Sequence, residues 1–415
     1  MPSAPGLSVC YVPGLDSRRV DAATTPFIHA ALGRYPSARI DTIPITELVP
    51  SMLTGVGPEL HGFWQMRLDP DAGRRRPRLG DRLPDRLTTF AQCLLHLAHP
   101  AFDLAAIPPR RRRRFTLTRF KYTRRQQSAE VIGNIGGFDS IIGVLGPGRA
   151  RYLFSKRLGE LDVIARRLSE GPEQLLFAEV YGLDLLQHWS LDQPGRLRDG
   201  YARIDRFVAD LHSRTTAAGR RLVLLVDHGQ EPVRGTVDIP SRLRALGIPE
   251  EEYSYFLDVP MARFWFHSDR AREAITAMLH ATPNGRALSY TELAACGVAF
   301  ENADYGELYF AADPGFIIFP HDFYHPIANL FLGLRDPQQR PRIRNPVHRG
   351  SHGHLPGHDS ERGYLVVFDD AVEAEVPMMQ LVDVAPTLLT LAGQTPPDYM
   401  RGRSAVRSRS AARTG

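Results

Sequence analysis

The chain has 415 residues, 43% of them hydrophobic and 23% charged, so it can bury a large core and bulk disorder is excluded. Its formal net charge of +5 is carried almost entirely by arginine, and no known reader motif accompanies that charge, which argues against a nucleic-acid partner. Three cysteines without CxxC spacing, no apolar run approaching the roughly 20 residues of a membrane helix and no signal-peptide pattern favour a cytoplasmic protein without a membrane partner.

The N-terminal part alternates between strand and helix patterns. Residues 7–12 form an apolar run typical of a buried strand, which ends at Pro13. A helix start follows at residues 24–26, and residues 39–43 alternate as a second strand. Residues 44–50 then predict a turn from strand to helix.

Composition changes from about residue 65 to residue 127. Arginine runs among prolines predict an inserted, partly exposed segment there. The run at residues 110–114 fits a solvated surface better than a clamp for a polyanionic substrate, although arginine forks suit such a clamp.

The middle of the chain returns to regular α/β patterning. Helical apolar spacing covers residues 158–168 and 201–211. The apolar runs at residues 175–181 and 222–226 predict strands, and the second is typical of a buried parallel strand.

These patterns predict an α/β fold with a mostly parallel sheet and an insertion. We expect the first part of the core at residues 1–235, a small α+β cap subdomain at 236–345 and the closing part of the core at 346–400. Within the cap, the aromatic cluster at 264–266 fits a packed strand better than a platform for a nucleobase. The arginine-rich, serine-rich residues 401–415 predict a disordered basic tail.

Three short motifs, far apart in the chain, supply ligands of the kind that metal ions bind. Asp184 and His188 are four residues apart and would share one face of a helix. Asp227 and His228 follow the strand at 222–226, and His352 stands before a glycine. Because open α/β sheets carry their sites at the carboxyl ends of strands, these residues predict a zinc or manganese site there.

The ordered set of motifs resembles the alkaline phosphatase superfamily, and within it the type I phosphodiesterase/nucleotide pyrophosphatase branch. The resemblance extends over roughly residues 7–400 and implies a three-layer α/β/α core. It also implies a metal-dependent hydrolase of phosphoric esters with two divalent ions, zinc first and manganese as the alternative, and a small anionic phosphoester substrate such as a nucleotide. The motifs that carry it are residues 50–62, Asp184 with His188, Asp227 to Gly229, residues 305–315, His352 with Gly353, and residues 382–389.

The resemblance also implies roles for single residues. Asp184, His188 and His352 would hold one ion, and Asp227 with His228 would help to hold the other. A threonine at a helix start would attack phosphorus, and Thr46 fits that place best, with Thr42 as the alternative.

One departure concerns the second ion. The family's first strand usually ends in Asp-Gly, whose aspartate is a ligand, but this chain has Pro13 there. Asp16 and Glu47 are the candidates to replace it. His354 and His358, close to the third motif, are candidates for contacts with the substrate or with the ligands.

Other functions stay open. A phosphotransferase, phosphonate hydrolase or sulfatase could use the same fold, the sulfatase least well because neither cysteine nor serine stands at Thr46. Pro13 also permits a catalytically impaired metal-binding pseudoenzyme. The sequence indicates no oligomeric state.

Overall fold

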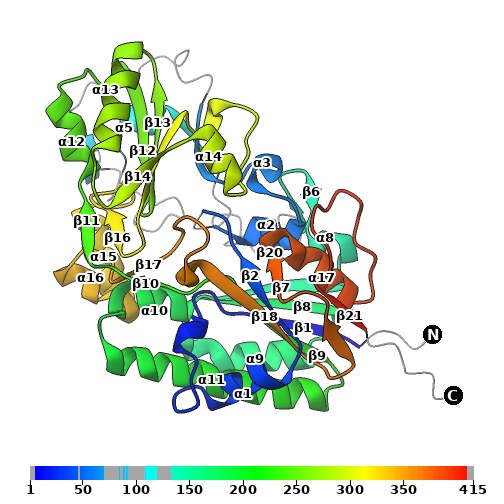
Figure 1. The fold of residues 1–415 in the computed structure, drawn as a ribbon. Helices are drawn as coiled ribbons and strands as arrows, with labels where there is room; N and C mark the ends of the chain where they lie inside the picture. The colour runs from blue at the N-terminus through cyan, green and yellow to red at the C-terminus, as the bar shows by residue number, and fades with distance from the viewer. Residues whose placement is uncertain are drawn as a thin grey trace.

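A seven-stranded, mostly parallel sheet forms the centre of the molecule (Figure 1). The structure, a computed structural model, describes residues 5–44, 47–69, 84, 87, 88, 90, 91, 107, 109–118 and 132–408. Within this sheet, as far as the described residues show it, only β18 runs antiparallel to its neighbours. Across the sheet, the strands are β20 (Met378–Gln380), β2 (Ser37–Asp41), β18 (Arg362–Phe368), β9 (Arg221–Val226), β1 (Leu7–Tyr11), β8 (Leu175–Val180) and β7 (Ala150–Ser155).

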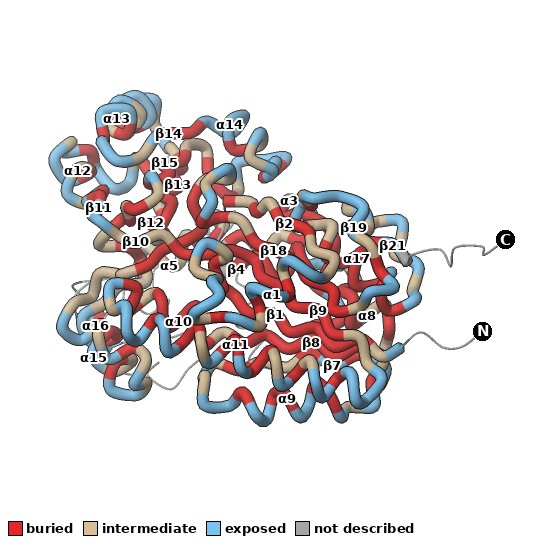
Figure 2. Tube along the Cα trace, turned by 60° about the horizontal axis from the view of Figure 1, so that its bottom comes forward, coloured by how far each residue is buried: buried red, intermediate tan, exposed pale blue. Residues whose placement is uncertain are grey.

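The central strands are apolar because helices cover both faces of the sheet. Every residue of β1 and β8 is buried, as are all those of β9 except its first. Parallel strands in such a position need apolar side chains on both sides, which explains their continuous hydrophobic runs. Figure 2 shows these strands as the buried centre, with exposed residues along the outer sides of the covering helices.

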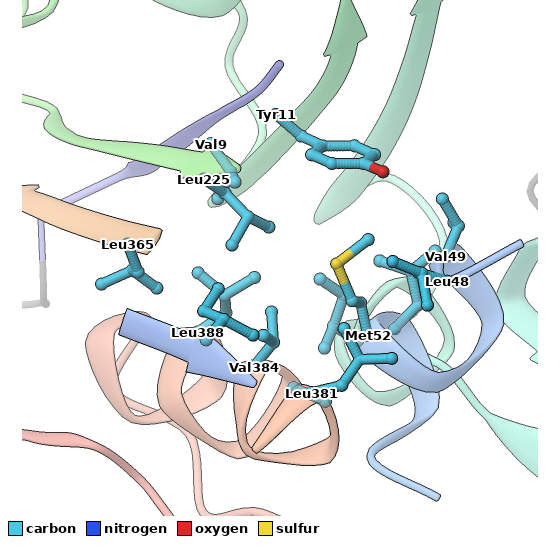
Figure 3. Close-up of a cluster of buried hydrophobic side chains, with 14 of the residues drawn as sticks. Val9, Tyr11, Leu48, Val49, Met52, Leu225, Leu365, Leu381, Val384 and Leu388 are labelled. Carbon is cyan, nitrogen blue, oxygen red and sulfur yellow. The ribbon is translucent and has the colours of Figure 1, made fainter. Parts of the chain in front are cut away.

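Two helical layers cover the sheet and give the predicted three-layer α/β/α core. The first layer holds α1 (Pro26–Arg34), α9 (Leu161–Glu170) and α11 (Pro194–Ala217), which pack against the side of β1 that carries Cys10. The second layer holds α2 (Val49–Thr54), α8 (Ile141–Leu145) and α17 (Val384–Leu391), which pack against Val9 and Tyr11 (Figure 3). The fold class predicted from the sequence is confirmed.

No helix of the described residues is long and apolar enough to cross a membrane.

A second sheet lies within residues 236–345, the range expected for a cap. Its four strands are antiparallel, and α12 (Ile239–Leu246) and α13 (Asp269–His280) contribute to the apolar core beside it. Phe264 and Trp265 are buried, so these aromatic side chains pack inside the subdomain. In order, the strands are β12 (Tyr253–Leu257), β13 (Met261–Phe266), β15 (Leu308–Ala312) and β14 (Gly285–Ser289).

The described part of the arginine-rich segment packs on this second sheet. Its strands β3 (Gln65–Leu68) and β4 (Phe115–Thr118) pair with each other, and Phe115 packs against Trp265. Arg111, in the short helix α5 (Pro109–Arg112), lies 2.6 Å from Asp322 and stacks over a tyrosine ring. The prediction of a solvated arginine run is therefore wrong for Arg111, which holds the segment to the cap.

The C-terminal segment is more ordered than predicted. Strand β21 (Val406–Ser408) pairs antiparallel with β19 (Val372–Ala374), and the backbone N–H of Arg401 donates to the carbonyl of Gly55. The expectation of disorder from residue 401 is therefore wrong as far as 408, because backbone pairing outweighs the polar composition. Residues 409–415 lie outside the described residues.

The helix α17 should contribute strongly to stability through Leu388. This side chain is fully buried on the face of α17 that packs against the sheet, so Leu388→Ala should lower the free energy of unfolding by about 2–5 kcal/mol. Leu334→Ala, in the exposed face of α15 (Pro326–Arg335), is the matched control and should stay within about 0.5 kcal/mol of wild type. Urea denaturation measures both, and equal midpoints would contradict this account of the core.

A pH-dependent contribution should come from His61, which ends α3 (Pro58–His61). The ring is buried beside Ser51, and burial lowers its pKa from 6.5 to about 3. Between these values the unfolded chain binds a proton that the folded chain does not, so stability should fall as pH falls from 6.5 towards 3.

The measurement is the free energy of unfolding at several pH values in that interval. It should depend less steeply on pH in His61→Gln than in wild type, whereas the exposed His280→Gln should keep the wild-type slope. Equal slopes in all three proteins would show that His61 contributes nothing.

Candidate metal centre

The three adjacent strands β8, β1 and β9 end at one cavity. It has a volume of about 290 Å³, and the residues that line it include Pro13, Glu179 and Asp227, which lie in or just after these strands. Carboxyl ends of parallel strands meet at one edge of a sheet, where the helices leave a crevice. The candidate ligands from all three motifs line this cavity.

Three of the candidate ligands form a compact group. Asp184 and His188 lie on one face of α10 (Gly182–Ser190), and His352 follows the short strand β17 (Gly350–Ser351). The Nε2 atom of His188 is 3.3 Å from Oδ2 of Asp184, and that of His352 is 3.7 Å from Oδ1. One ligand atom from each lies within 4.8 Å of the others. Two ligand atoms of one tetrahedral zinc ion are about 3.4 Å apart, so this spacing suits a shared ion.

The hydrogen bonds around this group leave ligand atoms directed at one point. Nδ1 of His188 is 2.9 Å from the carbonyl oxygen of Gly350, so Nδ1 carries a proton and Nε2 is the ring atom that can bind a metal ion when the imidazole is neutral. Gln230 donates to Oδ1 of Asp184 at 2.5 Å, whereas the buried Oδ2 has no hydrogen-bond partner. A buried carboxylate oxygen without a hydrogen-bond partner, 3.3 Å from a ring nitrogen, can share one divalent ion with that nitrogen, so these residues fit such an ion.

The electrostatics agree with this geometry. Burial alone would raise the pKa of the Asp184 carboxyl, but the neighbouring His188, His352 and His228 hold it well below its usual range. Asp184 is therefore a carboxylate at any working pH, which is the form that binds metal.

The second pair of candidate ligands lies beside the first group. The ring of His228 stacks on that of His352 with centroids 3.6 Å apart, and its Nε2 is 3.2 Å from Oδ2 of Asp227. Burial opposes a charge on His228, but Asp227, Asp184 and Glu361 outweigh it and raise its pKa to about 10. All five candidate ligands from the sequence are thus brought to one cavity.

The other candidates from the sequence are placed differently. Thr46 lies outside the described residues, and Thr42 donates its hydroxyl hydrogen to the carbonyl of Glu361 at 2.5 Å. Asp16 is paired with Arg18 at 2.7 Å, whereas Glu47 is buried and lines the cavity. Of the two alternatives for the missing carboxylate, only Glu47 therefore faces the site.

The two downstream histidines make local contacts. Nδ1 of His354 is 3.1 Å from the carbonyl oxygen of Ala312, and Nδ1 of His358 is 2.8 Å from the hydroxyl of Ser360. Glu361, which accepts a hydrogen bond from the backbone N–H of Gly353 beside His352, is the clearer supporting residue.

Several lining residues escaped prediction from the sequence. Tyr11 and Glu179 stand opposite each other in neighbouring strands and both line the cavity, with Lys156 nearby in its wall. His321 and His348 line it too, with their ring centroids 5.8 Å apart. The alternation of β1 places Tyr11 on the same side as residue 13, which was a usable signal. No local pattern signals His321, which reaches the cavity from a loop after the second sheet.

Comparisons of the whole chain with solved structures decide the fold family. Human ectonucleotide pyrophosphatase/phosphodiesterase 5 matches at 14% identity with a TM-score of 0.56, over 94% of this chain and 96% of that one. The chain folds as a nucleotide pyrophosphatase/phosphodiesterase does. The murine protein matches at 15% identity and TM-score 0.59, over 95% and 96% of the two chains. An inactive murine variant in complex with AMP matches at 14% and 0.56, over 94% and 96%. The sequence matches no protein-family model and no curated protein.

This fold-level match confirms the resemblance drawn from the motifs. The central sheet and its covering helices are arranged as in these ectonucleotide pyrophosphatase/phosphodiesterase structures. At such low identity the match concerns the fold, and the chemistry depends on the residues in the cavity.

The hydrogen bond from Gln230 to Asp184 should matter for metal binding. Gln230→Ala removes the donor that orients this carboxylate, and we expect about a 10- to 100-fold weaker zinc affinity. Gln394→Ala, whose side chain bonds to the neighbouring Gly393 carbonyl, is the control and should bind zinc as wild type does. Competition with a fluorescent chelator measures the affinity, and unchanged binding in Gln230→Ala would contradict the role.

Proposed function

We propose that the protein is a metal-dependent hydrolase of phosphoric esters, namely a phosphodiesterase or nucleotide pyrophosphatase. The observation that carries the proposal is the group of Asp184, His188 and His352, whose ligand atoms converge inside the cavity and include an unpartnered carboxylate oxygen. Two imidazoles and a carboxylate suit zinc best, with manganese as the alternative.

The residues of this chain would divide the work as follows. A divalent ion held by the three ligands supplies Lewis-acid stabilisation of the phosphoryl oxygens when it is bound. Gln230 and the Gly350 carbonyl orient two of the ligands from behind, so the site is preorganised. Thr46 remains the proposed nucleophile, because the resemblance places a threonine hydroxyl just before α2.

The proposed substrate is a small anionic phosphoester, with a nucleotide as the first candidate. The complex of the murine relative with AMP motivates this choice. In this chain, Phe154 and Tyr181 line the cavity close to Lys156, so aromatic surface and a cationic group lie together. Such a wall would suit a ring next to an anionic group.

Two alternatives follow from specific observations. The same fold and ion site would serve a phosphotransferase, a phosphonate hydrolase or, less well, a sulfatase, and substrate profiling distinguishes them. The proline at position 13 favours an impaired, metal-binding pseudoenzyme, which would bind nucleotide or metal without turnover.

Hydrolysis of bis-p-nitrophenyl phosphate tests the proposed function. We expect chelation to abolish turnover and zinc or manganese to restore it. Asp184→Asn should lower kcat/KM by more than about 100-fold, since even indirect changes at metal sites cost 10- to 100-fold. The exposed Asp199→Asn in α11 is the matched control and should keep wild-type activity.

Removing His228 should also abolish hydrolysis, because its ring lies against His352 in the same cavity. Turnover that survives complete removal of metal would overturn the proposal. Metal binding without turnover on phosphodiesters, phosphomonoesters, phosphonates and sulfate esters would favour the pseudoenzyme.

A further inference from the structure

A tyrosine, Tyr11, lines the cavity close to Asp227, where the resemblance implies a further aspartate at position 13. Side chains alternate along a strand, so Tyr11 and Pro13 face the same side of the sheet. Proline offers no ligand atom, but the Tyr11 hydroxyl reaches the site and donates to Oδ2 of Asp227 at 2.5 Å. Tyr11 is 2% exposed and lines the cavity, so its hydroxyl occupies interior space next to the second pair of ligands.

The carboxylate of Asp227 is fully supplied with protein donors. Oδ1 accepts hydrogen bonds from the backbone N–H groups of His228, at 2.9 Å, and Gly14, at 3.3 Å. Oδ2 accepts the bond from Tyr11. A buried carboxylate is costly unless its oxygens have partners, and here the chain itself provides them. Asp184 differs, because its Oδ2 has no hydrogen-bond partner and lies 3.3 Å from Nε2 of His188.

The pair of Asp227 and His228 also lacks a third ligand. Among the residues that the structure describes, Asp184, His188 and His352 make the single group of three whose ligand atoms lie within 4.8 Å of one another. The carboxylate of Asp16 is held by Arg18, and Glu179, although it lines the cavity, accepts a hydrogen bond from Tyr152. Glu47 also lines the cavity, but it does not form such a group of three with Asp227 and His228. The residues that the structure describes therefore fit one divalent ion and do not fit the second ion that the resemblance implies.

We propose that the protein holds one resident ion, and that a hydrogen-bonded unit of Tyr11, Asp227 and His228 stands where relatives in this fold would hold a second. The inference rests on the proposed function, which requires an ion only at Asp184, His188 and His352. In this arrangement Asp227 is a positioning residue. It ties the loop after β1 to the loop after β9, through Gly14 and Tyr11 on one side and His228 on the other.

Metal stoichiometry tests the inference without reference to activity. Native mass spectrometry and elemental analysis of zinc-loaded protein should give one ion per chain, and a cobalt(II) titration followed by visible absorption should saturate at one equivalent. Asp227→Asn should still bind one ion, because that side chain is not a ligand. Asp184→Asn should bind none.

A gain of metal binding tests whether Tyr11 and Pro13 are the reason that a second ion is absent. Combining Tyr11→Ser with Pro13→Asp removes the hydroxyl that fills the position and supplies the missing carboxylate, so this double variant should bind two ions. Tyr290→Phe, at an exposed tyrosine, is the control and should bind one. If the double variant folds correctly and still binds one ion, Tyr11 and Pro13 are not the residues that exclude the second ion.

The wild-type measurement needs no variant and separates the two proposals. Two ions per wild-type chain, falling to one in Asp227→Asn, would overturn the one-ion inference and leave the hydrolase proposal intact. No ion in wild type, together with turnover that needs no metal, would overturn both. One ion with metal-dependent turnover supports both.

Discussion

Two buried aspartates at the edge of one sheet impose the constraint on which the centre of this molecule depends. An ionised carboxylate in the interior has to meet a cation or a full set of donors. Asp227 meets this requirement with the hydroxyl of Tyr11 and two backbone N–H groups. Asp184 does so only in part, since Gln230 donates to one oxygen and the other, which faces His188, has no hydrogen-bond partner. The difference between them is the basis for proposing a cation at Asp184 and none at Asp227.

The architecture explains why both aspartates can be held in this way. β9, β1 and β8 lie side by side and parallel, so the segments that leave their carboxyl ends meet at one cavity. The helical layers and the second sheet keep that edge buried, which strengthens each electrostatic interaction inside it. Arg111 and its partner Asp322 help to hold part of the arginine-rich segment against the second sheet, so charge in this region serves packing.

Much of the candidate site was predictable because its ligands carry local signals. The spacing of Asp184 and His188 suits one face of a helix, and Asp227 with His228 directly follows an apolar run that becomes β9. Fold class followed from the same patterns, since continuous apolar runs indicate covered parallel strands. The prediction of a solvated arginine run was wrong for Arg111, because composition does not distinguish a solvated guanidinium from one stacked on Tyr255. The prediction of disorder from residue 401 was wrong for a similar reason, because the pairing of β21 with β19 is made by backbone groups, which every residue has.

The sequence by itself determined which residues this protein has for its fold and its candidate site: the apolar strands, the candidate ligand pairs at helical and strand-end spacing, and the proline where the resemblance implies an aspartate. Only the tertiary structure decided how that inventory is used. It brought His352 to α10, from which it is far away in the sequence, and it turned Asp16 towards Arg18 and Tyr11 towards Asp227. The physical reason is that such contacts depend on strand order, register and side-chain direction, which are properties of the packed chain and have no local signature.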